Sequence, residues 1–239
     1  MNRRSVQQIA ILFGVCMLLV SGLMLWSQNV NKGSDLLRNS AGEVEEFNGP
    51  FSAEALQADK QTITNSMNPT AVFTTNNGAI EIELFENQMP VTVANFTKLA
   101  EEGFYNGTKF HRIIDGFMIQ GGDPNSKGNN TSIYGQGGPG YTIQDEFVAD
   151  DNLSNVRGSI SMANTGQPNS GGSQFFINTV DNLGLDFNKE PLSSKHPVFG
   201  HVVKGIDIID VISKLETGQG DVPVNPVIIE SITIMRTEG

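Results

Sequence analysis

The sequence predicts a mainly-β domain, a closed antiparallel β-barrel capped by two α-helices, over residues 68–239. Three observations lead to this fold class. Short stretches in which apolar and polar residues alternate recur along the chain. Turn residues separate them, as at Asn77-Gly78 and Asp115-Gly116. Only two stretches have apolar residues at helical spacing. Many short strands with so few helices are typical of an antiparallel barrel, which pairs its own sheet edges.

The first elements of this domain are a strand pair and a helix. Residues 70–84 contain an Asn-Gly turn, after which apolar residues alternate with glutamates, as expected for a strand with one buried face. In the next stretch, 90–103, apolar residues lie three and four positions apart, and a glycine ends the pattern. We therefore expect a β-hairpin followed by an α-helix.

The remaining elements follow in the same way. Residues 109–122 form a second strand-turn-strand pattern around an Asp-Gly turn. A loop rich in Gly and Asn comes next. The sequence then predicts three strands at 158–164, 173–178 and 197–203, a second helix at 206–216 and a closing strand at 227–235.

An apolar run occupies the N-terminal region. Its 18 residues, from Ile9 to Trp26, would span about 27 Å as a helix, which is about the thickness of a bilayer core. Arg3 and Arg4 precede the run and favour a cytoplasmic N-terminus, so that the rest of the chain crosses the membrane. The sequence therefore predicts a signal anchor over residues 1–26.

A cleaved signal peptide is the alternative to the anchor, because small residues at 20–22 would suit a cleavage site. Residues 27–67 lose periodicity and are rich in Asn, Ser, Gly and Gln, which predicts a flexible linker. Both alternatives place the domain at 68–239 outside the cytoplasm. The anchored form would lie at the cell surface or in the periplasm, and the cleaved form would be secreted.

The composition excludes several classes of partner and site. The formal net charge is −11, whereas a nucleic-acid-binding protein needs a basic surface to displace counterions. Cys16 is the only cysteine, so the chain forms neither an internal disulfide nor a cysteine metal cluster. We expect no nucleic-acid partner.

Three motifs that suggest cofactor, nucleophile or metal chemistry do not have the required context. Residues 135–140 match the G-x-G-x-x-G pattern, but a proline and strand-like residues stand where a helix must begin. Ser173 lacks the glycine two positions later that a nucleophile elbow requires. His111, His196 and His201 show no zinc-ligand spacing. The sequence therefore predicts no cofactor and no metal.

Three other motifs carry a family resemblance: "FHRIIDGFMIQGGDP" at 110–124, "SMANTGQPNSGGSQFFIN" at 161–178 and "KHPVFG" at 195–200. Together and in this order they resemble the cyclophilins, a family of peptidyl-prolyl cis-trans isomerases. The resemblance covers roughly residues 70–236. It implies a closed eight-stranded antiparallel β-barrel with two capping α-helices and an active groove on its outer face.

The resemblance also implies which residues form the groove. Arg112 corresponds to the family's catalytic arginine, and the family often has a tryptophan at the pocket rim, where this chain has Leu183, Gly184 and Leu185. The residues implied as catalytic are Arg112, Phe117, Gln120, Phe176 and His196. Those implied as substrate-binding are Met118, Ala163, Asn164, Thr165, Gln174 and Leu185.

These residue types suit the rotation of an X-Pro bond. Rotation breaks amide resonance against a barrier of about 18–20 kcal/mol, and the twisted prolyl nitrogen regains its lone pair. A donor aimed at that nitrogen stabilises the transition state more than the planar ground state. An arginine is always charged, and a neighbour such as Gln120 would hold its planar fork. The reaction needs no nucleophile.

The sequence therefore predicts a monomeric, membrane-tethered isomerase that acts on proline-containing segments of unfolded or exported polypeptides. The alternative is a proline-peptide-binding or chaperone module that keeps the groove without turnover. The arginine favours the enzyme, because binding alone does not require it.

Overall fold

The computed structural model describes residues 68–192 and 194–236. The predicted membrane segment at 1–26 and the predicted linker at 27–67 lie outside these residues. Within the described part of the chain, no helix is both long and apolar enough to cross a bilayer.

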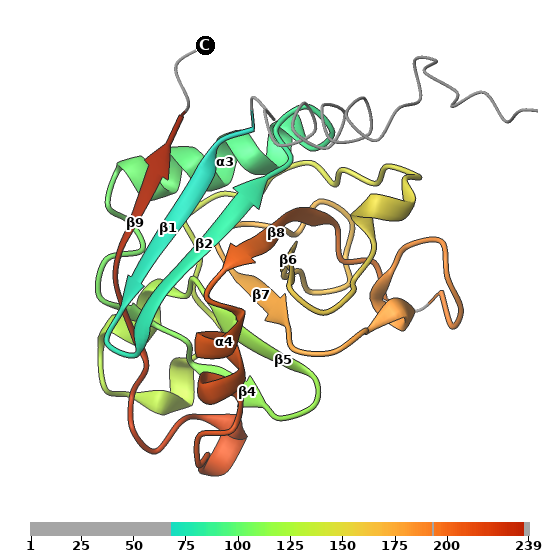
Figure 1. Ribbon diagram of the computed structural model, residues 1–239. Helices are drawn as coiled ribbons and strands as arrows, with labels where there is room; N and C mark the ends of the chain where they lie inside the picture. Colours follow the sequence, from blue (N-terminus) through green and yellow to red (C-terminus); the bar gives the residue numbers. More distant parts are fainter. Residues whose placement is uncertain (1–67, 193, 237–239) are drawn as a thin grey trace, which may run out of the picture. The chain divides into compact units, whose positions relative to one another are not determined.

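The described domain is mainly β and antiparallel, as predicted, and its strands form one curled sheet (Figure 1). The order of neighbours is β3-β9-β1-β2-β8-β6-β7-β5-β4, and every pair is antiparallel. The strands are β1 (Thr70–Thr75), β2 (Gly78–Leu84), β3 (Thr108–Lys109), β4 (Arg112–Ile114), β5 (Met118–Gly121), β6 (Ser159–Met162), β7 (Phe175–Asn178), β8 (Val198–Lys204) and β9 (Ile228–Met235).

The sheet has nine strands and two edges, which differs from the closed eight-stranded barrel that the family resemblance implied. The edge strands β3 and β4 are consecutive in the chain, and only Phe110 and His111 separate them. The backbone N–H of Phe110 donates to Val227 on the β9 side, and that of His111 donates to Gln120 on the β5 side. The segment 108–114 therefore pairs with β9 at one edge of the curled sheet and with β5 at the other. It forms two strands because its pairing partner changes at Phe110 and His111.

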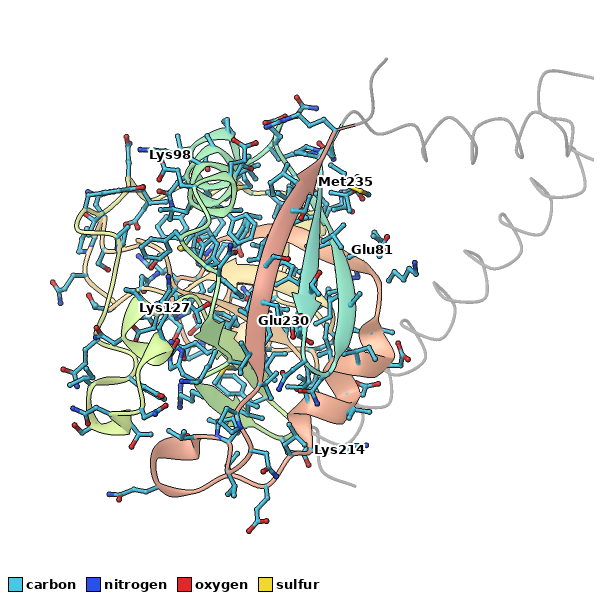
Figure 2. The ribbon with its side chains drawn as sticks, turned by 90° about the vertical axis from the view of Figure 1, so that its left-hand side faces the viewer. Glu81, Lys98, Lys127, Lys214, Glu230 and Met235 are labelled. Carbon is cyan, nitrogen blue, oxygen red and sulfur yellow. The ribbon has the colours of Figure 1, made fainter. Side chains whose placement is uncertain are left out.

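The β1–β2 hairpin shows why the strands form as predicted. Ile80, Ile82 and Leu84 are fully buried and alternate with residues on the outer face. Glu81, on that outer face, accepts a 2.8 Å hydrogen bond from Lys204 of β8. Glu230 has the same outward position on β9, and Figure 2 labels both glutamates. The alternation therefore fixes which face of the sheet covers the core.

In the part of the chain that the structure describes, two α-helices pack against the sheet, α3 (Pro90–Glu101) and α4 (Ile206–Ser213) (Figure 1). The carboxylate of Glu146 accepts hydrogen bonds from the backbone N–H groups of Val91 and Thr92, and so caps the start of α3. α4 ends three residues before its predicted end at 216, because Lys214 already leaves the helical conformation.

The core lies between the sheet and the two helices, since Ile209 and Ile212 of α4 belong to it, and it is rich in aromatic rings next to α3. Phe96 of α3 contacts Phe73, Tyr105, Phe175 and Phe199, with ring centroids 5.3–6.0 Å apart. All five rings are fully buried. This packing makes the inner face of the sheet rigid and leaves the outer face of β4, β5 and β7 for other contacts.

Candidate active site

Three predicted site residues lie opposite one another on neighbouring strands. Arg112 of β4 pairs with Gln120 of β5, and Gln120 pairs with Phe176 of β7. The adjacent residues Ile113 and Phe175 point into the core. Because side chains alternate along a strand, Arg112, Gln120 and Phe176 form a row across the outer face of the sheet.

Met118 and Phe176 are buried on this outer face. Their exposed fractions are 1% and 5%, yet neither belongs to the core cluster. The sequence alone left open whether these side chains belong to the core or to a pocket. Their burial outside the core shows that they form an apolar floor on the outside of the sheet.

That floor belongs to a pocket of about 290 Å³, which we call the Phe176 pocket. A cavity of this size suits a small ring. Nine of the eleven predicted site residues line it: Arg112, Phe117, Met118, Gln120, Ala163, Asn164, Phe176, Leu185 and His196.

The other two predicted residues, Thr165 and Gln174, line an adjacent pocket of about 480 Å³, the Gln174 pocket. The two pockets share Gln120, Ala163 and Asn164 as a common wall. The predicted residues therefore surround two connected hollows of one groove.

The partner of Arg112 differs from the expected one. Its Nε donates to the carboxylate of Asp221 at 3.3 Å, and the two side chains are 42% and 46% exposed. Gln120, which we expected to hold the arginine, donates through Nε2 to Gln174 Oε1 at 3.0 Å. The reason is that β4 faces the 3-10 turn η5 (Gln219–Asp221), which brings a carboxylate to the arginine.

Gln120 belongs instead to a chain of amides. Gln174 accepts from Gln120 and donates through its own Nε2 to the carbonyl oxygens of Gly135 and Gly137, at 3.0 and 2.8 Å. Each amide then has one defined orientation. Gln120 is thereby held beside Arg112 without bonding to it.

His196 closes one side of the Phe176 pocket as a neutral imidazole. Its Nδ1 lies 3.1 Å from the carbonyl oxygen of Met162, and a carbonyl only accepts, so Nδ1 carries the proton. Its ring meets Phe176 edge-on, with centroids 5.3 Å apart. Burial lowers the pKa of His196, although the bond to Met162 opposes this shift. At neutral pH the side chain is therefore an uncharged wall of the pocket.

Asn164 lines the groove, and its side chain is already hydrogen-bonded. Its side-chain Nδ2 donates to the carbonyl oxygen of Lys195 at 2.7 Å, and its Oδ1 accepts from the N–H of Gly166 at 3.0 Å. Within residues 68–192 and 194–236, no hydrogen bond occupies the backbone N–H or C=O of Asn164. A peptide in the groove can therefore pair with this backbone.

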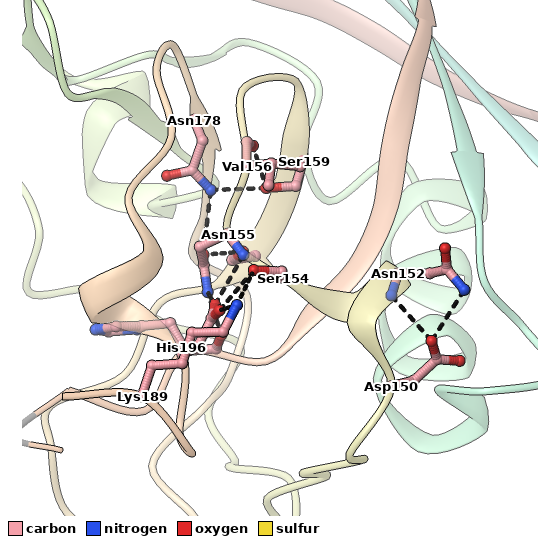
Figure 3. Close-up of polar contacts among 11 residues, drawn as sticks. Asp150, Asn152, Ser154, Asn155, Val156, Ser159, Asn178, Lys189 and His196 are labelled. Atoms are coloured by element: carbon pink, nitrogen blue, oxygen red, sulfur yellow. Dashed lines mark hydrogen bonds and ion pairs between the residues drawn. The ribbon is translucent and has the colours of Figure 1, made fainter. Parts of the chain in front are cut away.

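A buried polar network lies next to the rim residue Leu185, and Figure 3 shows Ser154, Asn155, Lys189 and His196 within it. The carboxylate of Asp186, next to Leu185, accepts hydrogen bonds from Ser154 and from the backbone and side chain of Asn155. Asn155 also donates to the carbonyl oxygen of His196 at 3.1 Å. The network thus connects the rim residue Leu185 to the segment that carries His196.

The charge of Asp186 is compensated inside this network. Its side chain is 4% exposed, and Lys189 lies 2.9 Å from its Oδ2. Burial alone would raise the pKa of Asp186, but hydrogen bonds from Ser154, Asn155 and Lys189 outweigh burial, so the pKa lies below its ordinary value. The carboxylate stays ionised and holds the rim in place.

Comparisons with known proteins agree with this arrangement. A family model described as cyclophilin type peptidyl-prolyl cis-trans isomerase matches residues 70–234. Peptidyl-prolyl cis-trans isomerase B of Escherichia coli is 44% identical over 169 residues, which cover 68% of this chain and 97% of that protein. Peptidyl-prolyl cis-trans isomerase A of Mycobacterium tuberculosis is 42% identical over 197 residues, covering 74% and 99%.

A solved structure shows the same fold. It is a Cryptosporidium parvum cyclophilin type peptidyl-prolyl cis-trans isomerase, determined in the presence of the dipeptide Ala-Pro. It superposes with a TM-score of 0.60 at 31% sequence identity and covers 70% of this chain and 99% of that one.

Proposed function

Because the chain belongs to the cyclophilin family of peptidyl-prolyl cis-trans isomerases, we propose that it seats a substrate proline in the Phe176 pocket and accelerates rotation of the preceding bond with Arg112. The isomerase activity itself follows from the family. The assignment of roles rests on one observation. Among the described residues that line this pocket, Arg112 is the only strongly basic one, and it shares the pocket with the buried apolar side chains of Met118 and Phe176.

The geometry suits the chemistry of the rotation. A proline ring on the floor places its nitrogen near the edge of the pocket, where the guanidinium of Arg112 lies. That nitrogen accepts a hydrogen bond only when the amide is twisted, so the interaction selects the transition state. The apolar floor excludes water, which strengthens the interaction. A rate gain of about five powers of ten requires roughly 7 kcal/mol of selective stabilisation.

Substrate chains are held by the rest of the groove. The backbone of Asn164 pairs with the substrate backbone, while Ala163, Thr165 and Gln174 contact the residues on one side of the proline. Phe117, Leu185 and His196 complete the pocket wall. The substrates are therefore proline-containing polypeptides, and the Ala-Pro dipeptide used with the Cryptosporidium relative is of the same class.

The direct test is a protease-coupled assay on a short X-Pro peptide with micromolar full-length chain. We expect turnover well above the uncatalysed rate, whose time constant is about 10–100 s. Peptide binding without any turnover would identify the non-catalytic module instead.

We expect Asp221→Ala to lower kcat/KM roughly three- to tenfold, because an arginine released from its partner samples more orientations. The free energy of unfolding should change by less than about 1 kcal/mol, because exposed ion pairs contribute little. Asp221→Asn should recover part of the activity, since its amide oxygen still accepts from Nε. Peptide assays and thermal melts measure both effects.

The matched control for this prediction is Asp210→Ala. Asp210 pairs with Arg157 at 2.7 Å, and the side chains of Arg157 and Asp210 are 44% and 43% exposed, close to the values for Arg112 and Asp221. This variant should keep full activity. An Asp221→Ala protein that equals or exceeds the parent in kcat/KM would show that Asp221 does not position the arginine.

We also propose that the apolar run from Ile9 to Trp26 anchors the chain in a membrane, with the domain on the extracytoplasmic side. The length of the run and the Arg3-Arg4 pair support this topology. Residues 27–67 would then act as a tether for a monomeric domain at 68–239. The clients would be unfolded or newly exported chains.

The location can be tested by fractionation of cells that express the full chain. It should sediment with membranes, and protease added to the extracytoplasmic side should digest the domain. A mature N-terminus just after Gly22 would replace the anchor with a cleaved signal peptide. Full-length protein in the cytosol would contradict both topologies.

A further inference from the structure

A third cavity opens on the other side of Arg112 and Gln120 from the Phe176 pocket. It has a volume of about 490 Å³, and we call it the His111 pocket. Arg112 and Gln120 line both pockets, so these two side chains lie at the boundary between them. The residues around it are His111, Arg112, Gln120, Thr131, Ser132, Tyr134, Gly135, Gln219, Gly220 and Val222.

His111 is buried in the wall of this cavity without a hydrogen-bonding partner. Its exposed fraction is 3%, and neither ring nitrogen bonds to any residue that the structure describes. Its ring meets that of Tyr134 edge-on, with centroids 6.2 Å apart. Both nitrogens are covered in this structure, and Gly135, which also lines the cavity, is the neighbour beside Nε2: a Cβ placed on Gly135 would lie 3.8 Å from that nitrogen. A buried polar group without a partner is destabilising, and a ligand that displaces the wall beside Gly135 would give His111 the hydrogen bond that it lacks.

The charge state of His111 limits which ligand fits. Burial lowers the pKa of His111, and this effect outweighs the neighbouring Asp123, so the imidazole is neutral at pH 7. The nearby carbonyl of Lys109 favours a proton on the ring but lacks the geometry of a hydrogen bond. A neutral imidazole offers one donor and one acceptor.

The rest of the lining carries little net charge. Arg112 is the one charged group in the wall, and Asp221 pairs with it. The other polar groups are the amides of Gln120 and Gln219 and hydroxyl groups from the 131–134 segment. These groups both donate and accept, so they suit a carboxamide or a hydroxyl better than an ammonium or a carboxylate.

We propose that the His111 pocket binds an uncharged hydrogen-bonding side chain, a carboxamide or a hydroxyl, of a substrate residue within two positions of the proline. This inference rests on the proposed seat of proline in the Phe176 pocket. One flank of the substrate then follows Ala163–Thr165 through the Gln174 pocket, and the other flank passes Arg112 and Gln120 into the His111 pocket. The enzyme thereby prefers certain sequences around the proline.

Matched peptides test this preference with the full-length chain. Each pair differs in hydrogen bonding but not much in size: Gln against Met, and Thr against Val. The pairs are placed at the first and second positions before the proline and at the first and second positions after it. Exchange rates measured by NMR give kcat/KM without a coupling protease. One hydrogen bond of about 0.5–1.5 kcal/mol predicts a two- to tenfold preference for Gln or Thr on one side of the proline.

Variants then locate the preference. His111→Phe keeps a flat ring without nitrogens and should remove the preference. Thr131→Val changes an exposed residue of the same wall and should reduce the preference. This variant keeps the test possible if the His111→Phe protein does not fold. The matched control is Thr142→Val, another exposed threonine that lines the Gln174 pocket instead. Thr142→Val should leave the Gln-to-Met and Thr-to-Val rate ratios unchanged on the side of the proline that enters the His111 pocket.

The outcomes separate this inference from the proposed function. Equal rates within every Gln–Met and Thr–Val pair, with turnover present, would overturn the His111 pocket as a subsite and leave the isomerase intact. A preference that persists unchanged in the His111 and Thr131 variants would also overturn it. Absence of turnover on all peptides would instead contradict the proposed function.

Discussion

Replacement of Arg112 by alanine should lower kcat/KM for an X-Pro peptide by at least about tenfold, because the lost donor acts mainly on the twisted transition state. The side chain is 42% exposed on the outer face of the sheet, outside the core. The free energy of unfolding should therefore change by less than about 1 kcal/mol. Peptide kinetics and denaturant unfolding of the same preparations measure both quantities.

Two further variants make this test specific. Arg112→Lys keeps the charge but loses the planar fork, so we expect only partial recovery. Arg157→Ala removes an arginine of nearly equal exposure that also pairs with an aspartate, and it should keep parental activity. Parental activity in a folded Arg112→Ala protein would rule out the role that we assign to this arginine.

The second large effect is expected at the pocket floor. Phe176→Ala should lower kcat/KM more than tenfold and also reduce stability, because the ring is only 5% exposed and a buried phenylalanine contributes about 3–5 kcal/mol. The loss of the ring also removes the edge-on contact that places His196. Kinetic assays at a temperature well below the lowered melting point distinguish catalytic loss from unfolding.

Phe176→Leu serves as the matched variant for the floor. Leucine restores most of the buried apolar surface, so stability should largely return. The flat face against which a proline ring packs stays lost, and we expect activity to return only in part. A leucine variant as active as the parent would mean that the proline is seated elsewhere.

Much of the fold could be predicted from local patterns. The β1–β2 hairpin and α3 follow from alternation, a turn dipeptide and helical spacing, all of which act over a few residues. The division of the 108–114 segment into β3 and β4 could not be predicted this way. It depends on partners more than 100 residues away on β9 and nearby on β5, and no local pattern specifies a change of partner.

The candidate site shows the same limit. The family resemblance identified all nine residues that line the Phe176 pocket, but only five of the fifteen around the Gln174 pocket, because most of the others lie in the loop at 135–142. The prediction that Gln120 holds Arg112 was wrong. Its partner is Asp221, which lies 109 residues away in a turn whose sequence has no distinctive pattern. Asp186 and Asn155 were likewise missed, although buried and mutually bonded, because a lone Asp or Asn in a loop is usually exposed.

The positions of Arg112, Gln120 and Phe176 relative to one another are set by the pairing of β4, β5 and β7. A strand slip of one residue would turn each of these side chains to the opposite face, so the register that forms the sheet also keeps the three side chains together on its outer face. The outer walls of the neighbouring hollows come instead from loops, around 131–142 and 219–222. Loops accept substitution without disturbing the strands. Apart from Asp221, residues of these loops can therefore change which polypeptides bind while Arg112, Gln120 and Phe176 stay in place, and protein engineering can use the same positions.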